Sequence, residues 1–217
     1  STMAEMFYRA SSFDGDLSSA WDISRVTNIY QMFDGASSFN GDISSWDTSG
    51  ATTLAYMFKN ASSFNVDLTP WDVSRVATFE AMFQDATAYT QTLCWELPNG
   101  STTDGMFLAS DGSVSAHSAY AMADSSELQT AVSAWCSNSA TAETTYGHIK
   151  CWNTSAVTDM STLFASPDGD GGFCSTYDKF NDDISSWDTS RVSTMAEMFY
   201  RASSFDGDLS SAWDISR

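Results

Sequence analysis

The feature that most constrains this chain is a repeat of 24 to 26 residues that runs through most of the sequence. A Met-Phe pair marks one phase of the repeat, at Met6-Phe7, Met32-Phe33, Met57-Phe58, Met82-Phe83 and Met106-Phe107, with Leu163-Phe164 and Met198-Phe199 later. A Trp-acid pair marks a second phase, at Trp21-Asp22, Trp46-Asp47, Trp71-Asp72, Trp95-Glu96, Trp187-Asp188 and Trp213-Asp214, with Trp152-Asn153 in the same slot. Repeats of this length bury their apolar side only by stacking on their neighbours. The sequence therefore predicts a solenoid of stacked repeats, each of which we call a coil.

A second, longer recurrence joins the two ends of the sequence. The last 25 residues, Ser193–Arg217, are identical to the first 25, Ser1–Arg25, at a displacement of 192 positions. Two copies that drift independently would rarely stay identical over such a stretch. We therefore expect the sequence to be a window on a longer chain of tandem 192-residue units, each holding one cap and about six coils.

Within one coil, the apolar residues from Val26 to Phe39 are spaced by threes and fours, which predicts one face of a short helix. Aspartate and serine just upstream are expected to cap these helices, at Asp22 and Ser24, Asp47 and Ser49, Asp72 and Ser74, and Asp188 and Ser190. The rest of the coil, such as Gly41–Trp46, is predicted to be a short parallel strand that stacks at about 4.8 Å. The expected fold class is an α/β solenoid.

The pattern loosens between Leu97 and Ile149, which predicts a seam between repeat units. We predict solenoid coils over 1–110, a linker or loop over 111–124, a helical cap over 125–149 and the coils of the next unit over 150–217. The first part of the cap, Ser125–Cys136, has the spacing of an amphipathic helix. Its apolar side holds Leu128, Ala131, Val132 and Trp135, and the capping candidates are Asp124, Ser125 and Ser126.

Charge and hydropathy exclude two classes of partner. The formal net charge is −19, with nine basic residues against 28 acidic ones, so we expect no binding to nucleic acid. No apolar run approaches the roughly 18 to 20 residues that span a bilayer, so this segment is expected to hold no membrane span.

Acidic residues recur in two columns, with Asp16, Asp42, Asp67, Asp183 and Asp208 in one, and Asp22, Asp47, Asp72, Asp188 and Asp214 in the other. Turn formation and capping explain these columns, and calcium binding is the alternative, because hard cations need several converging oxygen ligands. His117 and His148 are isolated and belong to no recognised catalytic motif. We therefore expect no catalytic, cofactor-binding or metal-binding residue and no enzyme activity.

Covalent modification is predicted at two kinds of residue. Three sequons place candidate glycosylation sites at Asn99, Asn60 and Asn153, in that order of preference. The four cysteines form no CxxC pair, which favours two disulfides over a zinc site. We expect Cys94 to pair with Cys151, because both occupy the slot before a tryptophan, and Cys136 to pair with Cys174, although three connectivities are possible.

The string WDTSRVSTMAEMFYRASSFDGDLSSAWD, from Trp187 to Asp214, and its relatives at Trp21, Trp46 and Trp71 resemble a known repeat. It is similar to the surface-protein repeat of about 26 residues of mycoplasma and Listeria lipoproteins, BspA-like surface antigens and many algal proteins. The stretch Leu128–Phe164 also resembles the start of such arrays in algal members. The resemblance implies a leucine-rich-repeat-like solenoid, for which we expect a right-handed path, on secreted or surface-anchored proteins without catalytic residues.

The leading functional hypothesis is an extracellular or cell-surface structural protein, whose tandem units form a filament or stalk through head-to-tail contacts with itself. The alternative is an adhesin or binding module that recognises a glycan or a protein. Aromatic residues outside the repeat register, at Tyr120, Tyr146 and Tyr177, are the expected contact points for such a ligand.

Overall fold

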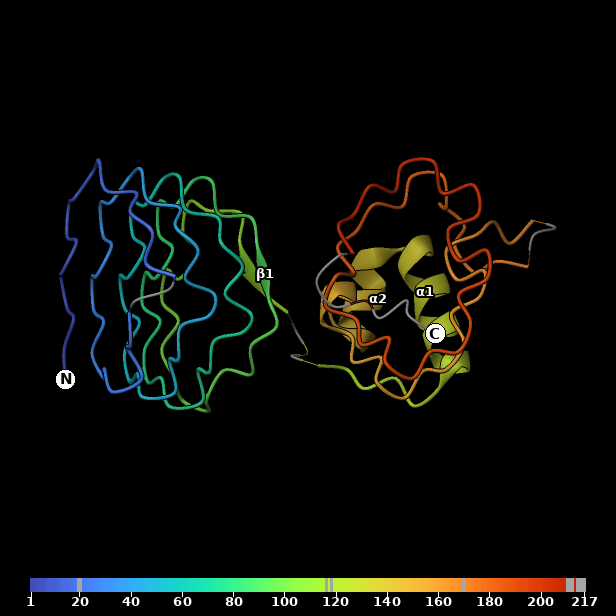
Figure 1. Ribbon diagram of the computed structural model, residues 1–217, viewed down its shortest axis with the longest axis horizontal. Helices are drawn as coiled ribbons and strands as arrows, with labels where there is room; N and C mark the ends of the chain where they lie inside the picture. Colours follow the sequence, from blue (N-terminus) through green and yellow to red (C-terminus); the bar gives the residue numbers. More distant parts are fainter. Residues whose placement is uncertain (19–20, 116, 118, 169–170, 210–212, 214–217) are drawn as a thin grey trace. The chain divides into compact units, whose positions relative to one another are not determined.

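The computed structural model describes residues 1–18, 21–115, 117, 119–168, 171–209 and 213. It divides into two compact units, Ser1–Val114 and Ser115–Arg217 (Figure 1). The boundary between them falls inside the stretch 111–124 that the sequence marks as a linker. In the described part of the chain, none of the helices has the length and apolar character that a membrane crossing requires.

Parallel backbone pairing joins the successive coils of the first unit. Single bridges connect Thr2, Asn28, Thr53, Thr78 and Thr102, each to the next. Strand β1 (Thr92–Leu93) pairs in parallel with strand β2 (Ser113–Val114). Figure 1 draws these coils as a row of similar loops, coloured from blue to green. Residues about 25 positions apart in the sequence are therefore direct neighbours in space.

The short helix predicted in each coil is replaced by a run of hydrogen-bonded turns, so that prediction was wrong. In the second coil, the backbone N–H groups of Gln31, Phe33 and Gly35 donate to carbonyls of the next coil at 2.8–3.1 Å. The N–H groups of the residues between them donate to the carbonyl three residues back. An α-helix would use all of these N–H groups for bonds four residues back. Stacking therefore takes the donors that a helix needs.

Two residues in most coils have a left-handed backbone, which also ends any helix; the coil with Leu163-Phe164 has one, Thr162. In the second coil they are Gln31, with φ 53°, and Gly35, with φ 75°. The equivalent pairs are Glu5 and Arg9, Tyr56 and Asn60, Ala81 and Asp85, Gly105 and Ala109, and Glu197 and Arg201. This conformation costs roughly 1–2 kcal/mol for a residue other than glycine. Its recurrence in coil after coil indicates that the bonds between coils outweigh the local cost.

The segment predicted as a strand, Gly41–Trp46, and the predicted helix caps form tight turns instead. The Oδ1 atom of Asp42 accepts from the backbone N–H of Ser44 at 3.0 Å and from its hydroxyl at 2.7 Å. The same turn follows Asp16, Asp22, Asp47, Asp67, Asp72, Asn153, Asp183 and Asp188. An aspartate that satisfies the residue two positions later stabilises a turn in place of a helix start. Asp214 lies outside the described residues.

Aromatic rings form columns through the core of the first unit. Phe33 is fully buried and stacks between Phe7 and Phe58, with ring centroids 5.2 Å and 5.7 Å away. The indole N–H groups of Trp46, Trp71 and Trp95 each donate to the carbonyl of an aliphatic residue of the preceding coil; for example, Trp46 donates to the Leu17 carbonyl at 3.2 Å. The same bond runs from Trp71 to the Ile43 carbonyl. The Met-Phe and Trp-acid markers are thus the residues that hold adjacent coils in register.

The second unit begins with the predicted amphipathic helix, here α1 (Ser125–Ser137). Asp124 caps it by accepting from the Glu127 N–H at 2.9 Å. The four predicted apolar residues are buried and share one core with Trp152. Helix α1 therefore covers the first coil of this unit, as an array cap is expected to do.

A second helix, α2 (Ser139–Tyr146), and a single 3-10 turn, η1 (Ile149–Cys151), follow α1. The sequence analysis did not separate α2, because only Ala142 on it is buried and the apolar period is therefore absent. Both ends of α2 do carry residues that are typical of helix caps. Asn138 accepts from the Thr141 N–H at 3.1 Å, and Gly147 follows the last helical residue with φ 71°.

Candidate functional site

The candidate site is an open apolar surface on the C-terminal coil, residues 193–217. Its described residues Met195, Phe199, Leu209 and Trp213 line a groove of about 410 Å³. Beside them, Tyr200 is 41% exposed. We call this surface the following face, because in other coils it contacts the coil that comes next in the sequence.

In the N-terminal coil, residues 1–25, the second coil lies against this face, and Met3, Phe7 and Trp21 are half-buried there. The N–H groups of Met3, Glu5 and Phe7 each donate to a carbonyl of the second coil at 2.9 Å. Leu17 is only 4% exposed, and its carbonyl accepts from the Trp46 indole. In the C-terminal coil, the N–H groups of Met195, Glu197 and Phe199 and the Leu209 carbonyl find no hydrogen-bond partner within the described residues. Within the described residues, the following face of residues 193–209 and 213 therefore lacks the backbone bonds that the other coils make to their next neighbour.

The opposite surface, which we call the preceding face, has the reverse distribution. In the C-terminal coil, the carbonyls of Thr194, Ala196 and Met198 accept from the preceding coil at 2.8–3.0 Å, and Met198 is 3% exposed. In the N-terminal coil, Met6 is 49% exposed. Four backbone and indole groups of this coil have no partner in the described part of the chain: the carbonyls of Thr2, Ala4 and Met6 and the indole N–H of Trp21. The equivalent groups of the C-terminal coil, the carbonyls of Thr194, Ala196 and Met198 and the indole N–H of Trp213, are all hydrogen-bonded.

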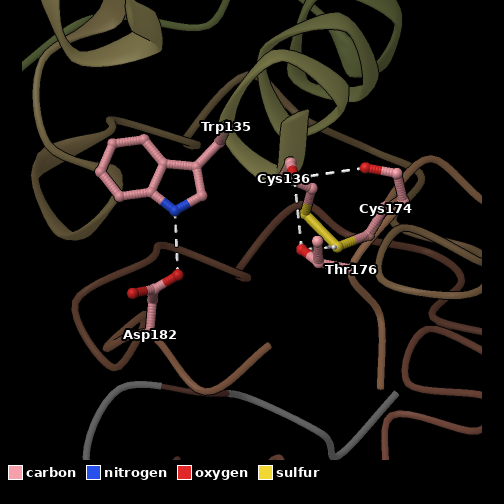
Figure 2. The surroundings of a disulfide bond; sticks show 6 residues. Trp135, Cys136, Cys174, Thr176 and Asp182 are labelled. Carbon is pink, nitrogen blue, oxygen red and sulfur yellow. Dashed lines mark hydrogen bonds between the residues drawn. A yellow bond between two sulfur atoms is a disulfide. The ribbon is translucent and has the colours of Figure 1, made fainter. Parts of the chain in front are cut away.

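A disulfide joins Cys136 at the end of α1 to Cys174, as the sequence predicts (Figure 2). The hydroxyls of Ser175 and Thr176 donate to the Cys136 carbonyl at 3.2 Å and 3.3 Å. Both sulfur-bearing residues are buried, which indicates a structural bond that ties the cap to the segment after Phe164. The pairing of Cys94 with Cys151 stays a prediction.

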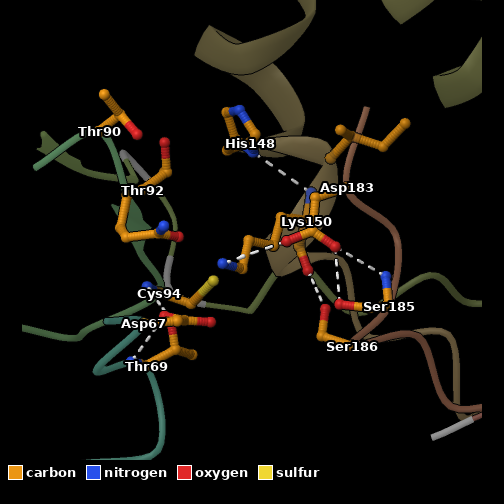
Figure 3. Close-up of polar contacts among 12 residues, drawn as sticks. Asp67, Thr69, Thr90, Thr92, Cys94, His148, Lys150, Asp183, Ser185 and Ser186 are labelled. Carbon is orange, nitrogen blue, oxygen red and sulfur yellow. Dashed lines mark hydrogen bonds and ion pairs between the residues drawn. The ribbon is translucent and has the colours of Figure 1, made fainter. Parts of the chain in front are cut away.

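An ion pair between a buried lysine and a half-exposed aspartate lies in the second unit and was not predicted (Figure 3). The Lys150 side chain is 5% exposed, and its Nζ atom lies 3.3 Å from Oδ2 of Asp183. Burial raises the pKa of Asp183, but hydrogen bonds from Ser185 and the Lys150 ammonium outweigh it and lower the pKa overall. The N–H of Lys150 donates to Nδ1 of His148, and burial lowers the pKa of that imidazole. No pattern in the sequence marks Lys150, since its burial depends on folding.

The aspartates of the two acidic columns stabilise tight turns. Hydrogen bonds from the serine two residues later lower the pKa of Asp16, Asp22, Asp72 and Asp188. Each carboxylate is therefore directed at its own turn. Among the residues that the structure describes, no group of three His, Cys, Asp or Glu side chains converges as a metal ion would require. No observation supports the calcium alternative.

The three sequons lie on exposed asparagines. Asn99 precedes Gly100, which has φ 83°. Asn60 donates from Nδ2 to Oδ1 of Asp34 at 3.1 Å, so its amide nitrogen is already engaged. The Oδ1 atom of Asn153 accepts from the Ser155 N–H, and the side-chain amide nitrogen takes no part in this bond. Glycosylation at these positions stays a prediction.

The tyrosines expected to be exposed contact points are half-buried, so that expectation was wrong. Tyr120, Tyr146 and Tyr177 all pack against the core of the second unit. The Tyr120 hydroxyl donates to Glu127 at 2.9 Å, which raises its pKa. The rings of Tyr120 and Tyr146 meet edge to face at 5.1 Å. These side chains stabilise the cap, and ligand binding by them stays a prediction.

A protein-family model matches residues 1–120 and 140–217; its description is "Mycoplasma protein of unknown function, DUF285". The match confirms the resemblance to a mycoplasma surface-protein repeat. No curated protein and no solved structure matches the chain.

Proposed function

The chain belongs to this family, whose description names no activity, and we propose that it is an extracellular structural protein built as a solenoid. In this proposal, tandem units of 192 residues stack end to end and form a surface filament or stalk. The protein has no catalytic role and acts by providing length, stiffness and a strongly acidic surface.

One observation carries the proposal. The identical segments 1–25 and 193–217 have opposite faces covered: the first has a coil on its following face, and the second has a coil on its preceding face. A segment with both neighbours is what a chain of tandem units would hold at each junction.

Two further observations support an extracellular location. The disulfide between Cys136 and Cys174 is typical of an oxidising compartment. The match to a mycoplasma repeat family agrees with surface exposure. Glycosylation of Asn99 and of the other two sequons belongs to the same proposal. No observation favours the adhesin alternative, since its expected aromatic contacts are half-buried.

The test is made on native material. Mass spectrometry of the mature protein is expected to give a chain much heavier than 23.6 kDa. Electron microscopy of the same sample is expected to reveal filaments or stalks. A mature chain near 24 kDa that stays monomeric would contradict the proposal.

A further inference from the structure

We propose that Asn99 is a site of covalent modification, at which water replaces the side-chain amide and the residue becomes aspartate or isoaspartate. The chain holds two Asn-Gly sequences, Asn40-Gly41 and Asn99-Gly100. Attack of the following backbone nitrogen on an asparagine side chain is least hindered before glycine, which has no Cβ atom. The fold restrains Asn40 and leaves Asn99 accessible, so the proposal concerns Asn99 alone. It does not depend on the proposed filament.

Asn99 and Gly100 form the exposed tip of a turn. The Ser101 N–H donates to the Pro98 carbonyl at 3.0 Å, which closes the turn around these two residues. Gly100 has φ 83°, as the third residue of a type II turn has, and a side chain there would meet no atom within 4 Å. Neither the Asn99 side chain nor the Gly100 N–H has a hydrogen-bond partner among the residues that the structure describes. Both reacting groups are therefore open to water and held by no such bond.

Asn40, in contrast, is held between stacked coils. Its Oδ1 atom accepts from the Asn65 N–H at 2.9 Å, and its own N–H donates to Oδ1 of Asp14 at 3.0 Å. Gly41 packs closely, since a Cβ atom there would lie 3.0 Å from the Gly15 carbonyl oxygen. To reach the Gly41 nitrogen, the Asn40 side chain must rotate and break its bond to the next coil. This Asn-Gly sequence therefore serves as an internal reference for the other.

The reaction needs only water as a co-reactant. The deprotonated Gly100 nitrogen attacks Cγ of Asn99, so that an N–C bond forms, the Cγ–Nδ2 bond breaks and ammonia leaves. The proton that the Gly100 nitrogen gives up is balanced by the proton that the leaving nitrogen gains. Water then opens the cyclic imide at either of its two carbonyls. Opening at one carbonyl gives aspartate and opening at the other gives isoaspartate, and no atom is oxidised or reduced.

The Nδ2 atom that is lost is also the attachment atom of an N-linked glycan. A glycan on Asn99 shields this amide, and a deamidated residue 99 no longer forms a sequon with Ser101. Glycosylation and deamidation are therefore alternative fates of one atom. Deamidation also adds a negative charge to a chain whose net charge is −19, and isoaspartate lengthens the backbone just before Thr102, which bridges to Thr78 of the preceding coil.

The experiment incubates the folded 217-residue chain, produced without N-glycosylation, in mildly alkaline, isotope-labelled water. Peptide mapping by mass spectrometry follows the replacement of each amide by a labelled hydroxyl. Asn99 is expected to react roughly tenfold faster than Asn40, which corresponds to about 1.4 kcal/mol of extra activation free energy at the restrained site. Both aspartate and isoaspartate are expected at position 99. In urea the two rates are expected to converge, because unfolding breaks the bond from Asn65 to Asn40.

Two variants separate the parts of the mechanism. Gly100→Ala is expected to slow the reaction at Asn99 several-fold, because the added methyl group hinders the attacking nitrogen. Ser101→Ala removes the sequon and keeps the Asn-Gly sequence. In a host that glycosylates Asn99, the wild type is expected to keep its Nδ2 atom, while Ser101→Ala is expected to lose it.

Equal rates at Asn99 and Asn40 in the folded chain would overturn the inference. Aspartate as the only product, or an unchanged rate in Gly100→Ala, would overturn the route through the imide. A glycosylated Asn99 that loses Nδ2 as fast as Ser101→Ala does would contradict the alternative fates. The mass of the native chain is measured separately, so these results leave the proposed filament to its own test.

Discussion

Residues 1–25 and 193–217 are one sequence in two environments. Their described parts have the same conformation: φ is 59° at Glu5 and 57° at Glu197, and Arg9 and Arg201 each lie 5.0 Å from the adjacent tyrosine ring. Burial differs, however. Met6 is 49% exposed where Met198 is 3% exposed. The comparison teaches that the local sequence sets the shape of a coil, while its neighbours decide which face is buried.

The largest expected effect compares a coil that has two neighbours with the two end coils. Phe33→Ala is expected to lower the free energy of unfolding by about 3–5 kcal/mol, because this fully buried ring contacts coils on both sides. Phe7→Ala and Phe199→Ala are each expected to cost about half as much, since each ring has one neighbouring coil. Urea unfolding followed by tryptophan fluorescence measures all three. Equal losses would break the comparison.

A smaller, crossed effect is expected inside the identical segments. Met198→Ala is expected to cost about 2–3 kcal/mol and Met6→Ala less than about 1 kcal/mol, in line with their burial. The order reverses on the other face, where Leu17→Ala is expected to cost more than Leu209→Ala, because Leu17 is 4% exposed and Leu209 is half-buried. The same urea titrations measure the four variants. If both substitutions in one segment destabilise the protein more than both substitutions in the other segment, the burial of opposite faces does not explain the difference between the segments.

A gain in stability is expected at Tyr89, which takes the place of Phe39 and Phe64 in its aromatic column. The Tyr89 hydroxyl is buried and has no hydrogen-bond partner among the described residues, and burial raises its pKa. Tyr89→Phe is expected to raise the free energy of unfolding by about 1 kcal/mol, because it removes an unsatisfied polar group at constant shape. Thermal unfolding monitored by circular dichroism measures the gain. Phe64→Tyr, which adds such a group, serves as the reverse control and is expected to destabilise.

The smallest expected effect concerns pH and compares Asp183 with Asp16, its equivalent in the N-terminal coil. The pKa of Asp183 is lowered in the folded protein, so its contribution to stability is present above about pH 4 and is lost as pH falls through the lowered value. Asp183→Asn is expected to remove less than about 1 kcal/mol at pH 7, because the carboxylate is half exposed. The difference from wild type is expected to shrink at pH 3.

Asp16 accepts from Ser18, and within the part of the chain that the structure describes it has no contact with a cation comparable to Lys150. Asp16→Asn is therefore expected to have the smaller effect of the two at pH 7. Urea midpoints at pH 7 and pH 3 check both variants. A larger loss at Asp16 than at Asp183 would contradict the role given to the Lys150 ammonium.

Much of the core could be predicted from spacing, although its backbone could not. The residues expected on one apolar face, among them Ile29, Met32, Phe33 and Ala36, are all fully buried. Spacing by threes and fours identifies a face, but it does not distinguish a helix from a run of turns whose alternate N–H groups bond to another coil. The choice between the two depends on a partner about 25 residues away. Local propensity carries no information about that partner.

The sequence predicted that a coil continues at this place, but it did not predict the geometry of the candidate site. The identical ends indicated that a coil continues into another unit, and the aromatic register indicated which residues stack. The open groove beside Leu209 and Trp213 and the unpaired N–H groups beside Met195 became visible only in the structure. The burial of Lys150 against Asp183 likewise depends on residues 33 positions apart and has no local marker.

The sequence by itself determined the repeat length, the residues that face the core and the helix α1, and it made the disulfide between Cys136 and Cys174 one of three possible connectivities. Each of these follows from local periodicity or from cysteine placement. Only the tertiary structure decided that the coils are made of turns, and which face of each identical 25-residue segment is covered. The physical reason is that both outcomes depend on hydrogen bonds and apolar contacts with a neighbouring coil, and identical residues acquire different surroundings when a different neighbour is present.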